Sequence, residues 1–404
     1  MKTILSLLFL IIWYVSVVAQ TPQWKIYNTS NSKIPWNKFK SMVFDKNGDL
    51  WGAYDNSSSG PHLTRFDGDT FYNYINSGWV NYLAADKSGD IWFTTSNMEL
   101  QKYGGNFVIY THSLLSSPWM EPVYVDPAYN VWIGNRNNNS IVKFTGSDWT
   151  EYKSTNSIIP QSGILSMTSY KGDMWFGTTD SGLVKFGSLE KKVFKTTNST
   201  LPSNRILALL EGKDDTLWFV CPGFLGYYDG SKFTTFANSN LKSANSLQMD
   251  SKGIMWISNP DFTSGGVYKY DRTSRTVYNK SNSVLPTNQL LDLKVDSKNN
   301  IWIATWGFGL VRMSPYASSV KETADLNFSI RPNPANKFIL INTENLNPPY
   351  SYTIYDVHGK IKMQGKIVEK GMFQTDISEL KADIYFLRLE NENNSFVKKL
   401  IKIE

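Results

Sequence analysis

A short motif that ends in tryptophan recurs along most of the chain and constrains its fold more than any other feature. The clearest copies begin with aspartate, carry glycine in the fourth position and occupy residues 45–51, 86–92 and 250–256. Looser copies occupy residues 126–132, 170–175, 212–218 and 296–302. The motif tryptophans are Trp51, Trp92, Trp132, Trp175, Trp218, Trp256 and Trp302, which lie 41, 40, 43, 43, 38 and 46 residues apart. A period in this range indicates stacked or radially arranged units that cannot bury their cores alone.

Each repeat is predicted to form four β-strands, and the fifth repeat is the clearest example. Apolar runs at residues 206–210, 217–220 and 224–228 predict three strands. Residues 232–236 alternate polar and apolar side chains, as a half-exposed edge strand does, and Asp229-Gly230 predicts a tight hairpin before them. Four antiparallel strands in about 42 residues are typical of one blade of a β-propeller.

The chemistry of the motif predicts a structural role for its tryptophans. The aspartate is expected to accept hydrogen bonds from backbone N–H groups two or three residues later. Glycine, or Asn299 in the last copy, supplies the positive φ that closes the turn. The tryptophan then lies on the second strand and faces the neighbouring blade, where burying about 200 Å² of indole contributes roughly 5 kcal/mol before opposing terms.

The outermost strands predict that the array of repeats closes into a ring. Most repeats end in an aromatic strand followed by an Asn-Ser bridge. An additional copy of this strand and bridge, residues 24–32, precedes the first motif, whereas the seventh repeat ends after residues 310–313 without a fourth strand. We therefore expect an all-β protein with a seven-bladed β-propeller that is closed by its N-terminal strand, so that no sheet edge is left open.

The N-terminus predicts export. A basic start, an apolar run from Ile4 to Val18 and small residues before Gln20 predict a signal peptide over residues 1–19. No other stretch approaches the ~20 apolar residues of a transmembrane helix, so the mature protein is expected to have no transmembrane segment. Cys221 is the only cysteine, cannot form an internal disulfide, and is expected to be a small buried thiol.

Two further sequence blocks accompany the tryptophan motif in the later repeats. Residues 182–186, 266–270 and 309–312 share glycine, an aliphatic residue and a basic residue in the same order, and Leu201-Pro202 and Leu285-Pro286 follow Asn-Ser bridges. With these blocks, residues 22–315 resemble the two-component regulator propeller repeat. The resemblance implies a propeller of the kind that often serves as an extracytoplasmic sensor and binds glycan fragments. The signalling half of that role is not expected, because the chain shows no kinase segment.

The repeat period stops after Ser314, and the sequence predicts a propeller over residues 20–316, a polar linker over 317–326 and a small domain over 327–404. Short strands without helical periodicity predict an immunoglobulin-like β-sandwich for this domain. It resembles the type A C-terminal sorting domain of type IX secretion cargo, with Asp383 where the family usually has glycine. The resemblance implies the type IX translocon as a partner, and secretion or cell-surface display by way of the periplasm. The sorting motif includes Pro332, Asn333, Pro334, Asp356, Gly359, Lys398 and Lys399.

The propeller also predicts where a ligand binds. Loops between second and third strands and loops between blades gather on one face around the channel, which is the usual ligand face. Aromatic side chains near amide, carboxylate and guanidinium groups suit a sugar, whose CH groups stack on indole while its hydroxyls take polar partners. The alternative is that the aromatics fill gaps between blades. The candidate ligand-binding residues are Trp36, Trp79, Trp119, Arg136, Asp180, Arg205, Asp261, Phe262, Trp306 and Phe308.

Little in the sequence indicates catalysis, a metal or a cofactor. His62, His112 and His358 lack metal-ligand spacing, and the first two are expected at the surface. The net charge of +6 is not gathered into a basic run, so no nucleic-acid partner is expected. We expect a non-enzymatic, monomeric binding protein with a glycan or other surface polymer as ligand. An extracellular polysaccharide lyase or hydrolase with carboxylates at the channel, and a protein–protein scaffold at the cell surface, remain as alternatives.

Overall fold

A computed structural model describes most of the chain. The described residues are 22–54, 60–75, 78–135, 138–271, 274–316, 328–344, 346, 348–356, 359–391 and 395–404. The predicted signal peptide (1–19) and linker (317–326) lie outside them. The described residues form strands without any helix, and thus no helix among them is long and apolar enough to cross a membrane. They fall into two compact units, the first being Pro22–Pro315 and the second including residues 328–404.

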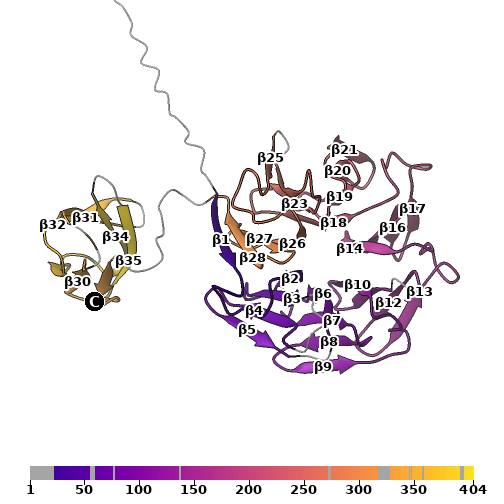
Figure 1. Cartoon of the computed structure of the whole chain (residues 1–404), viewed down its shortest axis with the longest axis horizontal. Coiled ribbons are helices and arrows are strands. Elements are labelled where there is room, and N and C mark those ends of the chain that lie inside the picture. Colours follow the sequence, from indigo (N-terminus) through magenta and orange to yellow (C-terminus); the bar gives the residue numbers. More distant parts are fainter. Residues whose placement is uncertain are drawn as a thin grey trace, which may run out of the picture. The chain divides into compact units, whose positions relative to one another are not determined.

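The first unit consists of four-stranded antiparallel sheets, which Figure 1 shows arranged around a common axis. The first four sheets, from the innermost strand outwards, are β2 (Phe39–Phe44), β3 (Leu50–Tyr54), β4 (Leu63–Phe66) and β5 (Phe71–Tyr74); β6 (Val80–Ala85), β7 (Ile91–Thr95), β8 (Leu100–Tyr103) and β9 (Phe107–Tyr110); β10 (Met120–Val125), β11 (Val131–Asn135), β12 (Ser140–Phe144) and β13 (Trp149–Tyr152); β14 (Ile164–Tyr170), β15 (Asp173–Thr178), β16 (Leu183–Phe186) and β17 (Lys191–Phe194). The next three sheets are β18 (Ala208–Glu211), β19 (Leu217–Cys221), β20 (Phe224–Tyr228) and β21 (Phe233–Ala237); β22 (Ser246–Met249), β23 (Met255–Asn259), β24 (Gly266–Tyr270) and β25 (Arg275–Tyr278); β26 (Leu290–Val295), β27 (Ile301–Thr305), β28 (Leu310–Ser314) and β1 (Gln23–Tyr27).

The seventh sheet joins the two ends of the first unit. Strand β1 pairs antiparallel with β28, and the register runs from Gln23 opposite Ser314 to Tyr27 opposite Leu310. The connection after β1 is braced in the same way as the later bridges, because the Asn31 carboxamide accepts the Asn28 N–H at 2.9 Å. The first strand of the unit therefore completes its last sheet.

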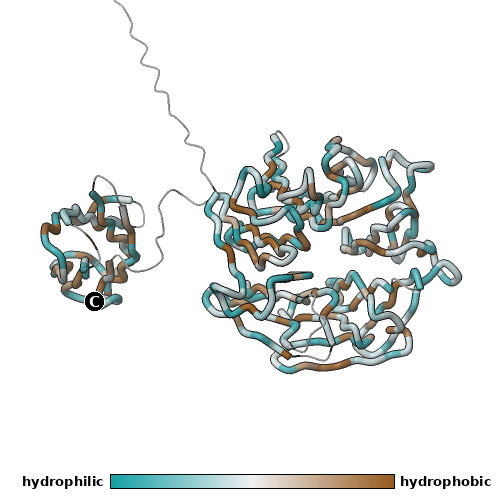
Figure 2. The backbone as a smooth tube through the Cα atoms, viewed as in Figure 1, coloured by the Kyte–Doolittle hydropathy of each residue, from teal (hydrophilic) through white to brown (hydrophobic). Residues whose placement is uncertain are grey.

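Hydrophobic side chains connect every sheet of this unit to the next, and Figure 2 shows hydrophobic stretches in the strands that carry them. Trp51 of the first sheet packs in one buried cluster with Val80 of the second. The five following clusters join the second to third, third to fourth, fourth to fifth, fifth to sixth and sixth to seventh sheets. The seventh cluster places Trp302 of the seventh sheet against Phe39 and Tyr54 of the first. Each motif tryptophan thus lies in a buried cluster that joins two sheets.

The motif aspartate has a second function that the sequence reasoning did not anticipate. One oxygen of Asp250 accepts backbone N–H groups from Lys252 and Ile254, two and four residues later, rather than two and three. The other oxygen accepts the indole N–H of Trp256 at 3.0 Å. The same indole bond, 2.8–3.0 Å long, joins Asp45 to Trp51, Asp86 to Trp92, Asp126 to Trp132, Asp250 to Trp256 and Asp296 to Trp302.

The two loosest copies of the motif lack this bond. Trp175 and Trp218 have buried indole N–H groups without a hydrogen-bond partner. Ser169 and Gly212 occupy the position six residues before them, where the other copies have aspartate. The looseness of these two copies in sequence therefore corresponds to a missing buried hydrogen bond.

Trp256→Phe is expected to lower the free energy of unfolding by about 2 kcal/mol more than Trp218→Phe, because a hydrogen bond to a charged group contributes about 1.5–3 kcal/mol. Both indoles are buried, with 0% and 1% of their surface exposed, so both substitutions remove similar packing. Only the change at position 256 also removes an N–H group that has a carboxylate partner. Urea unfolding followed by circular dichroism measures the difference, and equal losses at the two positions would contradict the role assigned to the aspartate.

The C-terminal unit contains two antiparallel sheets that share one core. The three-stranded sheet is β29 (Ser329–Arg331), β30 (Phe338–Asn342) and β33 (Met372–Asp376). The four-stranded sheet is β32 (Ile361–Ile367), β31 (Tyr350–Asp356), β34 (Asp383–Glu390) and β35 (Ser395–Lys402). Ile339 and Ile341 from the first sheet pack in the same buried cluster as Ile354, Leu387 and Leu400 from the second.

The predicted sorting motif has identifiable contacts in this unit. Asn333 donates from its carboxamide to the Lys399 carbonyl and accepts the Ile401 N–H, both at 2.8 Å, so it holds β35. The Asp356 carbonyl accepts the N–H of Gly359, which has a φ of 79° and closes the turn. Pro332, Pro334, Lys398 and Lys399 are exposed. Asp383 begins β34 without a positive φ, so a side chain fits where the family usually has glycine.

Candidate ligand-binding face

The order of strands divides the loops of the first unit between two opposite faces, because successive antiparallel strands reverse direction. We call one the turn face; it consists of the described parts of 45–49, 67–70, 86–90, 104–106, 126–130, 145–148, 171–172, 187–190, 212–216, 229–232, 250–254, 271–274 and 296–300. We call the other the loop face; it consists of the described parts of 28–38, 55–62, 75–79, 96–99, 111–119, 136–139, 153–163, 179–182, 195–207, 222–223, 238–245, 260–265, 279–289 and 306–309.

The innermost strands enclose a central cavity of about 270 Å³, which is lined by residues of all seven sheets. Lys294 supplies a cation to this lining, and its ammonium lies 3.1 Å from a carboxylate oxygen of Asp292. The other oxygen of Asp292 accepts the N–H of Met42 from the first sheet at 2.8 Å. Burial raises the pKa of the Tyr82 hydroxyl, so this lining group stays protonated. The channel is therefore lined mainly by apolar and neutral polar groups.

The loop-face end of the channel carries polar side chains at irregular points of the innermost strands. The register of β2, β6 and β10 shifts at Lys40, at Asn81 and at the pair that begins with Glu121. In a regular strand, side chains point alternately to the two faces of the sheet, and a bulge of this kind changes the direction of the side chain at the extra residue. The Lys40 ammonium lies 3.4 Å from a Glu121 carboxylate oxygen, and the Asn81 carboxamide donates to the Pro118 carbonyl at 2.8 Å. Three adjacent sheets thus place a lysine, an amide and a carboxylate at one side of the channel mouth.

Two of the predicted tryptophans flank this polar group. Trp79 and Trp119 are 36% and 50% exposed. Together with Lys40 and Asn81 they line a small pocket of about 30 Å³, and the Lys40 ammonium lies 5.7 Å from the centre of the Trp119 ring. The structure therefore brings two indole surfaces and several hydrogen-bonding groups into one small site.

A second aromatic group lies on the loop face of the seventh sheet. Trp306 and Phe308 are 53% and 49% exposed. The Lys38 ammonium, just before β2, lies 3.5 Å from the centre of the Trp306 ring, which is close enough for a cation–π interaction. Lys38 and Lys40 thus reach toward the seventh and third sheets respectively.

The remaining candidates are dispersed over the loop face. Trp36 is half-buried, donates its indole N–H to the Pro61 carbonyl at 3.2 Å and packs against the cluster between the seventh and first sheets, as a gap-filling residue does. Phe262 is 80% exposed, and Arg205 is also exposed. Arg136 lies outside the described residues.

The two candidate aspartates accept hydrogen bonds from residues of their own loop or of a neighbouring loop. Asp180 accepts the Ser162 hydroxyl at 2.6 Å, and the hydroxyl bonds lower its pKa. Asp261 accepts backbone N–H groups of Ser264 and Thr263 at 2.7 and 2.9 Å, and these bonds together with the hydroxyls of both residues lower its pKa. Both carboxylates therefore remain ionised and shape their loops.

Sequence reasoning missed Lys38, Lys40, Asn81 and Glu121. A usable signal was present, because the last three lie eleven residues before their motif tryptophans, in runs that are otherwise apolar. The corresponding residues are apolar in the fourth, fifth and seventh repeats, which have Ile164, Leu207 and Leu291, but the sixth repeat has Asn245. Three consecutive polar residues at this position therefore distinguish the first three sheets.

The histidine and cysteine side chains, which often act in catalysis, were located next. His62 is buried, contrary to the expectation of a surface position, because its carbonyl accepts the Tyr54 N–H and extends the first sheet. His112 is exposed and stacks on Trp149, with 5.1 Å between ring centres. His358 lies outside the described residues.

Cys221 is buried, and burial raises its pKa to about 12, so the thiol is protonated at neutral pH. Across the described ranges, no group of three histidine, cysteine or acidic side chains could hold a metal ion.

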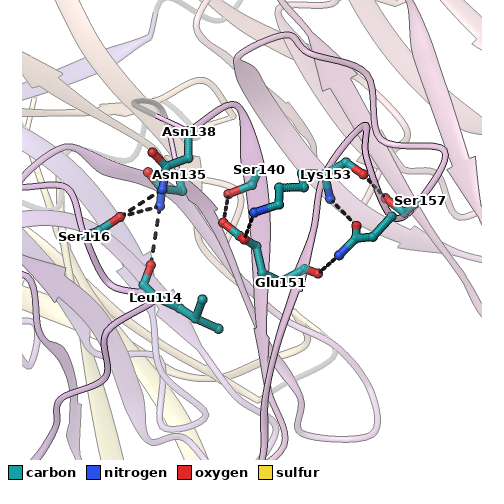
Figure 3. A network of polar contacts seen from close by, with 9 residues as sticks. Leu114, Ser116, Asn135, Asn138, Ser140, Glu151, Lys153 and Ser157 are labelled. Carbon is teal, nitrogen blue, oxygen red and sulfur yellow. Dashed lines mark hydrogen bonds and ion pairs between the residues drawn. The ribbon is translucent and has the colours of Figure 1, made fainter.

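Figure 3 shows a further carboxylate, in the outer strands of the third sheet, that is held by neighbours. Glu151 accepts the Ser140 hydroxyl at 2.8 Å and pairs with the Lys153 ammonium at 2.7 Å. The hydrogen bond from Lys153 holds the pKa of Glu151 below its usual range. This glutamate therefore braces the sheet rather than serving as a proton donor at neutral pH.

The C-terminal unit has a family match. Residues 329–404 match the family described as the secretion system C-terminal sorting domain. The sequence-based prediction of a sorting domain is thus confirmed, and the protein is secreted or displayed at the cell surface. No curated protein matches the sequence of this chain.

Solved structures with similar folds include three informative ones. PorZ, an essential surface component of the type-IX secretion system of Porphyromonas gingivalis, is 14% identical with a TM-score of 0.58, and the match covers 94% of this chain and 61% of PorZ. The extracellular domain of a hybrid two-component system from B. thetaiotaomicron is 14% identical with a TM-score of 0.60, over 95% of this chain and 58% of that one. Virginiamycin B lyase from Staphylococcus aureus is 15% identical with a TM-score of 0.60, over 73% of this chain and 99% of the lyase.

These likenesses show the β-propeller fold, which the repeat had predicted. At such identities they show the fold alone. This chain also spans only 61% and 58% of the lengths of PorZ and of the two-component extracellular domain.

Proposed function

We propose that this protein is a non-enzymatic, monomeric binding protein, secreted or held at the cell surface, whose loop face binds a glycan or another surface polymer. Residues 1–19 would direct export, residues 20–316 would form the propeller, and residues 327–404 would be recognised by the type IX translocon after the 317–326 linker. The observation that carries the binding function is the pocket in which Trp79 and Trp119 flank Lys40 and Asn81 at the channel mouth.

The seven sheets are, in this proposal, the blades of one closed seven-bladed propeller. Three observations support closure: β1 completes the sheet of β26 to β28, Trp302 packs with Phe39, and Asp292 accepts the Met42 N–H. Closure positions the loop face, because it brings the seventh sheet beside the first. The C-terminal unit, with two sheets around a shared core, would correspondingly be an immunoglobulin-like sandwich.

A sugar fits the chemistry of the pocket better than a purely apolar ligand does. Indole surfaces stack on the CH faces of sugar rings, while the ammonium of Lys40 and the amide of Asn81 can form hydrogen bonds with sugar hydroxyls. Exposed aromatics without such partners would instead favour a protein or lipid surface. The paired charges of Lys40 and Glu121 also remain partly exposed, with 22% and 26% of their side-chain surface accessible.

Trp79→Ala and Trp119→Ala are each expected to weaken binding of a polysaccharide found by glycan array by about 10- to 30-fold. Truncating a central interface tryptophan typically costs about 2 kcal/mol, and about 1.4 kcal/mol corresponds to tenfold in affinity. Isothermal titration with the purified full chain measures the loss. Leu189→Ala is a control, because Leu189 is fully exposed on the turn face.

The same purified protein separates binding from the alternative functions. Reducing-end and unsaturated-product assays on every polysaccharide that binds should show no turnover. Turnover would replace the binding function by a lyase or hydrolase activity. Absence of any glycan ligand, together with a protein partner that Trp79→Ala or Trp119→Ala abolishes, would instead identify a surface scaffold.

A further inference from the structure

Exposed hydrophobic side chains occupy one sector of the loop face. The described loop-face segments 153–163, 179–182, 195–207, 222–223 and 238–245, around the fourth and fifth sheets, have no large hydrophobic side chain that is exposed. Residues that only filled gaps between sheets would recur in every repeat. The restriction to one sector therefore indicates a binding surface. The exposed residues of this sector are Ile75, Trp79, Met98, Trp119, Phe262, Val284, Trp306 and Phe308.

Two aromatic groups of this sector lie near the start of β2. Strand β2 contacts β26 of the seventh sheet and β6 of the second. Trp306 belongs to a loop of the seventh sheet, whereas Trp79 and Trp119 precede the innermost strands of the second and third sheets. The seventh-sheet loop is fixed beside the first sheet, because Gly309 donates its N–H to the Asn37 carbonyl at 2.7 Å.

Two lysines at the start of β2 limit the distance between these aromatic groups. The Lys38 ammonium lies 3.5 Å from the centre of the Trp306 ring, and the Lys40 ammonium lies 5.7 Å from the centre of the Trp119 ring. Two residues of chain span at most about 7 Å, and a lysine ammonium reaches roughly 6 Å from its Cα. The two ring centres are therefore no more than about 30 Å apart, a distance that one oligosaccharide can cover.

Both groups keep aromatic surface for a ligand. Trp306 contacts the Lys38 ammonium, but 53% of its surface is exposed. The cation–π contact holds the ring in place, so this lysine is not required to contact the ligand. Trp119 is 50% exposed. Beside it, Lys40 and Asn81 offer an ammonium and an amide to sugar hydroxyls.

We propose, on the basis of the proposed glycan-binding function, that the loop face recognises an extended stretch of several sugar units in a linear polysaccharide rather than a single sugar. Trp79 and Trp119 stack on one part of the chain, while Trp306 and Phe308 stack on another unit of the same chain. The units between them pass over the start of β2. Once one group is occupied, the other binds in an intramolecular step, so affinity increases with chain length until both groups are reached.

Oligosaccharides of increasing length test this arrangement with the full chain. The probes are cello-, laminari-, xylo-, manno-, chito- and galacturono-oligosaccharides, from the disaccharide to the hexasaccharide, and a soluble form of each parent polysaccharide. Isothermal titration is expected to show, in at least one series, a hexasaccharide that binds at least thirtyfold more tightly than the disaccharide. A longer chain that only offers more binding registers gives a smaller gain. Equal affinity along every series that binds would overturn the spanning arrangement and leave glycan binding intact, whereas failure of every probe to bind would overturn the glycan-binding function itself.

Substitutions of the two aromatic groups test the residues. Trp306→Ala is expected to weaken binding of the hexasaccharide at least tenfold and of the disaccharide less than threefold, because only the longer ligand reaches the seventh sheet. Phe308→Ala, in the same loop, is expected to show the same length dependence, whereas Trp119→Ala is expected to weaken binding of both ligands.

Tyr72→Ala is the matched control. Tyr72 is also an exposed aromatic residue with a cation over its ring, since the Arg65 guanidinium lies 4.7 Å from the ring centre, but it belongs to the outermost strand of the first sheet. This variant is expected to change neither affinity, and circular dichroism checks that every variant is folded. If Trp306→Ala and Phe308→Ala change the two affinities equally, or change neither, the two groups do not share one chain, while a loss in Trp119→Ala would still support the glycan site.

Discussion

Replacing Trp256 with alanine is expected to lower the free energy of unfolding of the first unit by about 4–5 kcal/mol, the upper range for a buried tryptophan. Trp256 has 0% of its surface exposed and packs with Leu293 and Ile301 of the next sheet. The substitution leaves a cavity between two sheets and removes the indole donor to Asp250. Because domains are stable by only about 5–15 kcal/mol, the variant should unfold at a much lower urea concentration.

The same chemical change at an exposed tryptophan supplies the control. Trp119→Ala is expected to change the free energy of unfolding by less than about 1 kcal/mol, since half of the side chain is already exposed. Circular dichroism is the appropriate signal, because the chain has 14 tryptophans and fluorescence would change with each substitution. Similar losses at both positions would show that the motif tryptophans do not hold the sheets together.

Deleting residues 22–28 is expected to lower the free energy of unfolding of the first unit by more than about 5 kcal/mol. The deletion removes β1, leaves the edge of β28 unpaired and uncovers the contacts of Tyr27 with Phe66, Phe71 and Trp302. Loss of a buried aromatic side chain costs about 3–5 kcal/mol, and each lost backbone hydrogen bond adds about 1 kcal/mol. An unpaired edge strand also promotes aggregation.

Removal of the C-terminal unit provides the comparison for this deletion. A chain that ends before residue 317 retains all of Pro22–Pro315, and its first unit is expected to melt at the same temperature as in the full chain. Calorimetry of the three proteins separates the outcomes. An unchanged melting temperature after deletion of 22–28 would show that the stability of the first unit does not depend on its N-terminal strand.

Local structure in the repeats could be predicted from particular residues. The fifth repeat illustrates both the success and the limit of this reasoning. Its last three strands were predicted within one residue, but the first strand begins at Ala208 rather than at Ile206. Ile206 donates its N–H to the Thr178 carbonyl of the preceding sheet, at 2.9 Å, and therefore does not belong to the first strand of its own sheet. The apolar character of Ile206 alone does not show whether its backbone pairs with its own sheet or with the preceding one.

The candidate site could be predicted only in part. Trp79, Trp119, Trp306 and Phe308 are exposed on the expected face. Trp36, which looked equivalent to them in sequence, fills a gap between sheets. Lys40 and Glu121 were overlooked because they belong to strands that are otherwise apolar.

Repetition in the sequence was sufficient for the number of tryptophan units, the positions of their turns and the surplus strand at the start, because these depend on local turn residues and on the spacing of apolar residues. Only the tertiary structure shows three contacts between distant residues: the ion pair of Lys40 with Glu121, the cation–π contact of Lys38 with Trp306, and the hydrogen bond between Asp292 and the Met42 N–H. Those contacts join residues from different sheets, and a register shift of one residue in an innermost strand decides which side chain reaches the channel mouth.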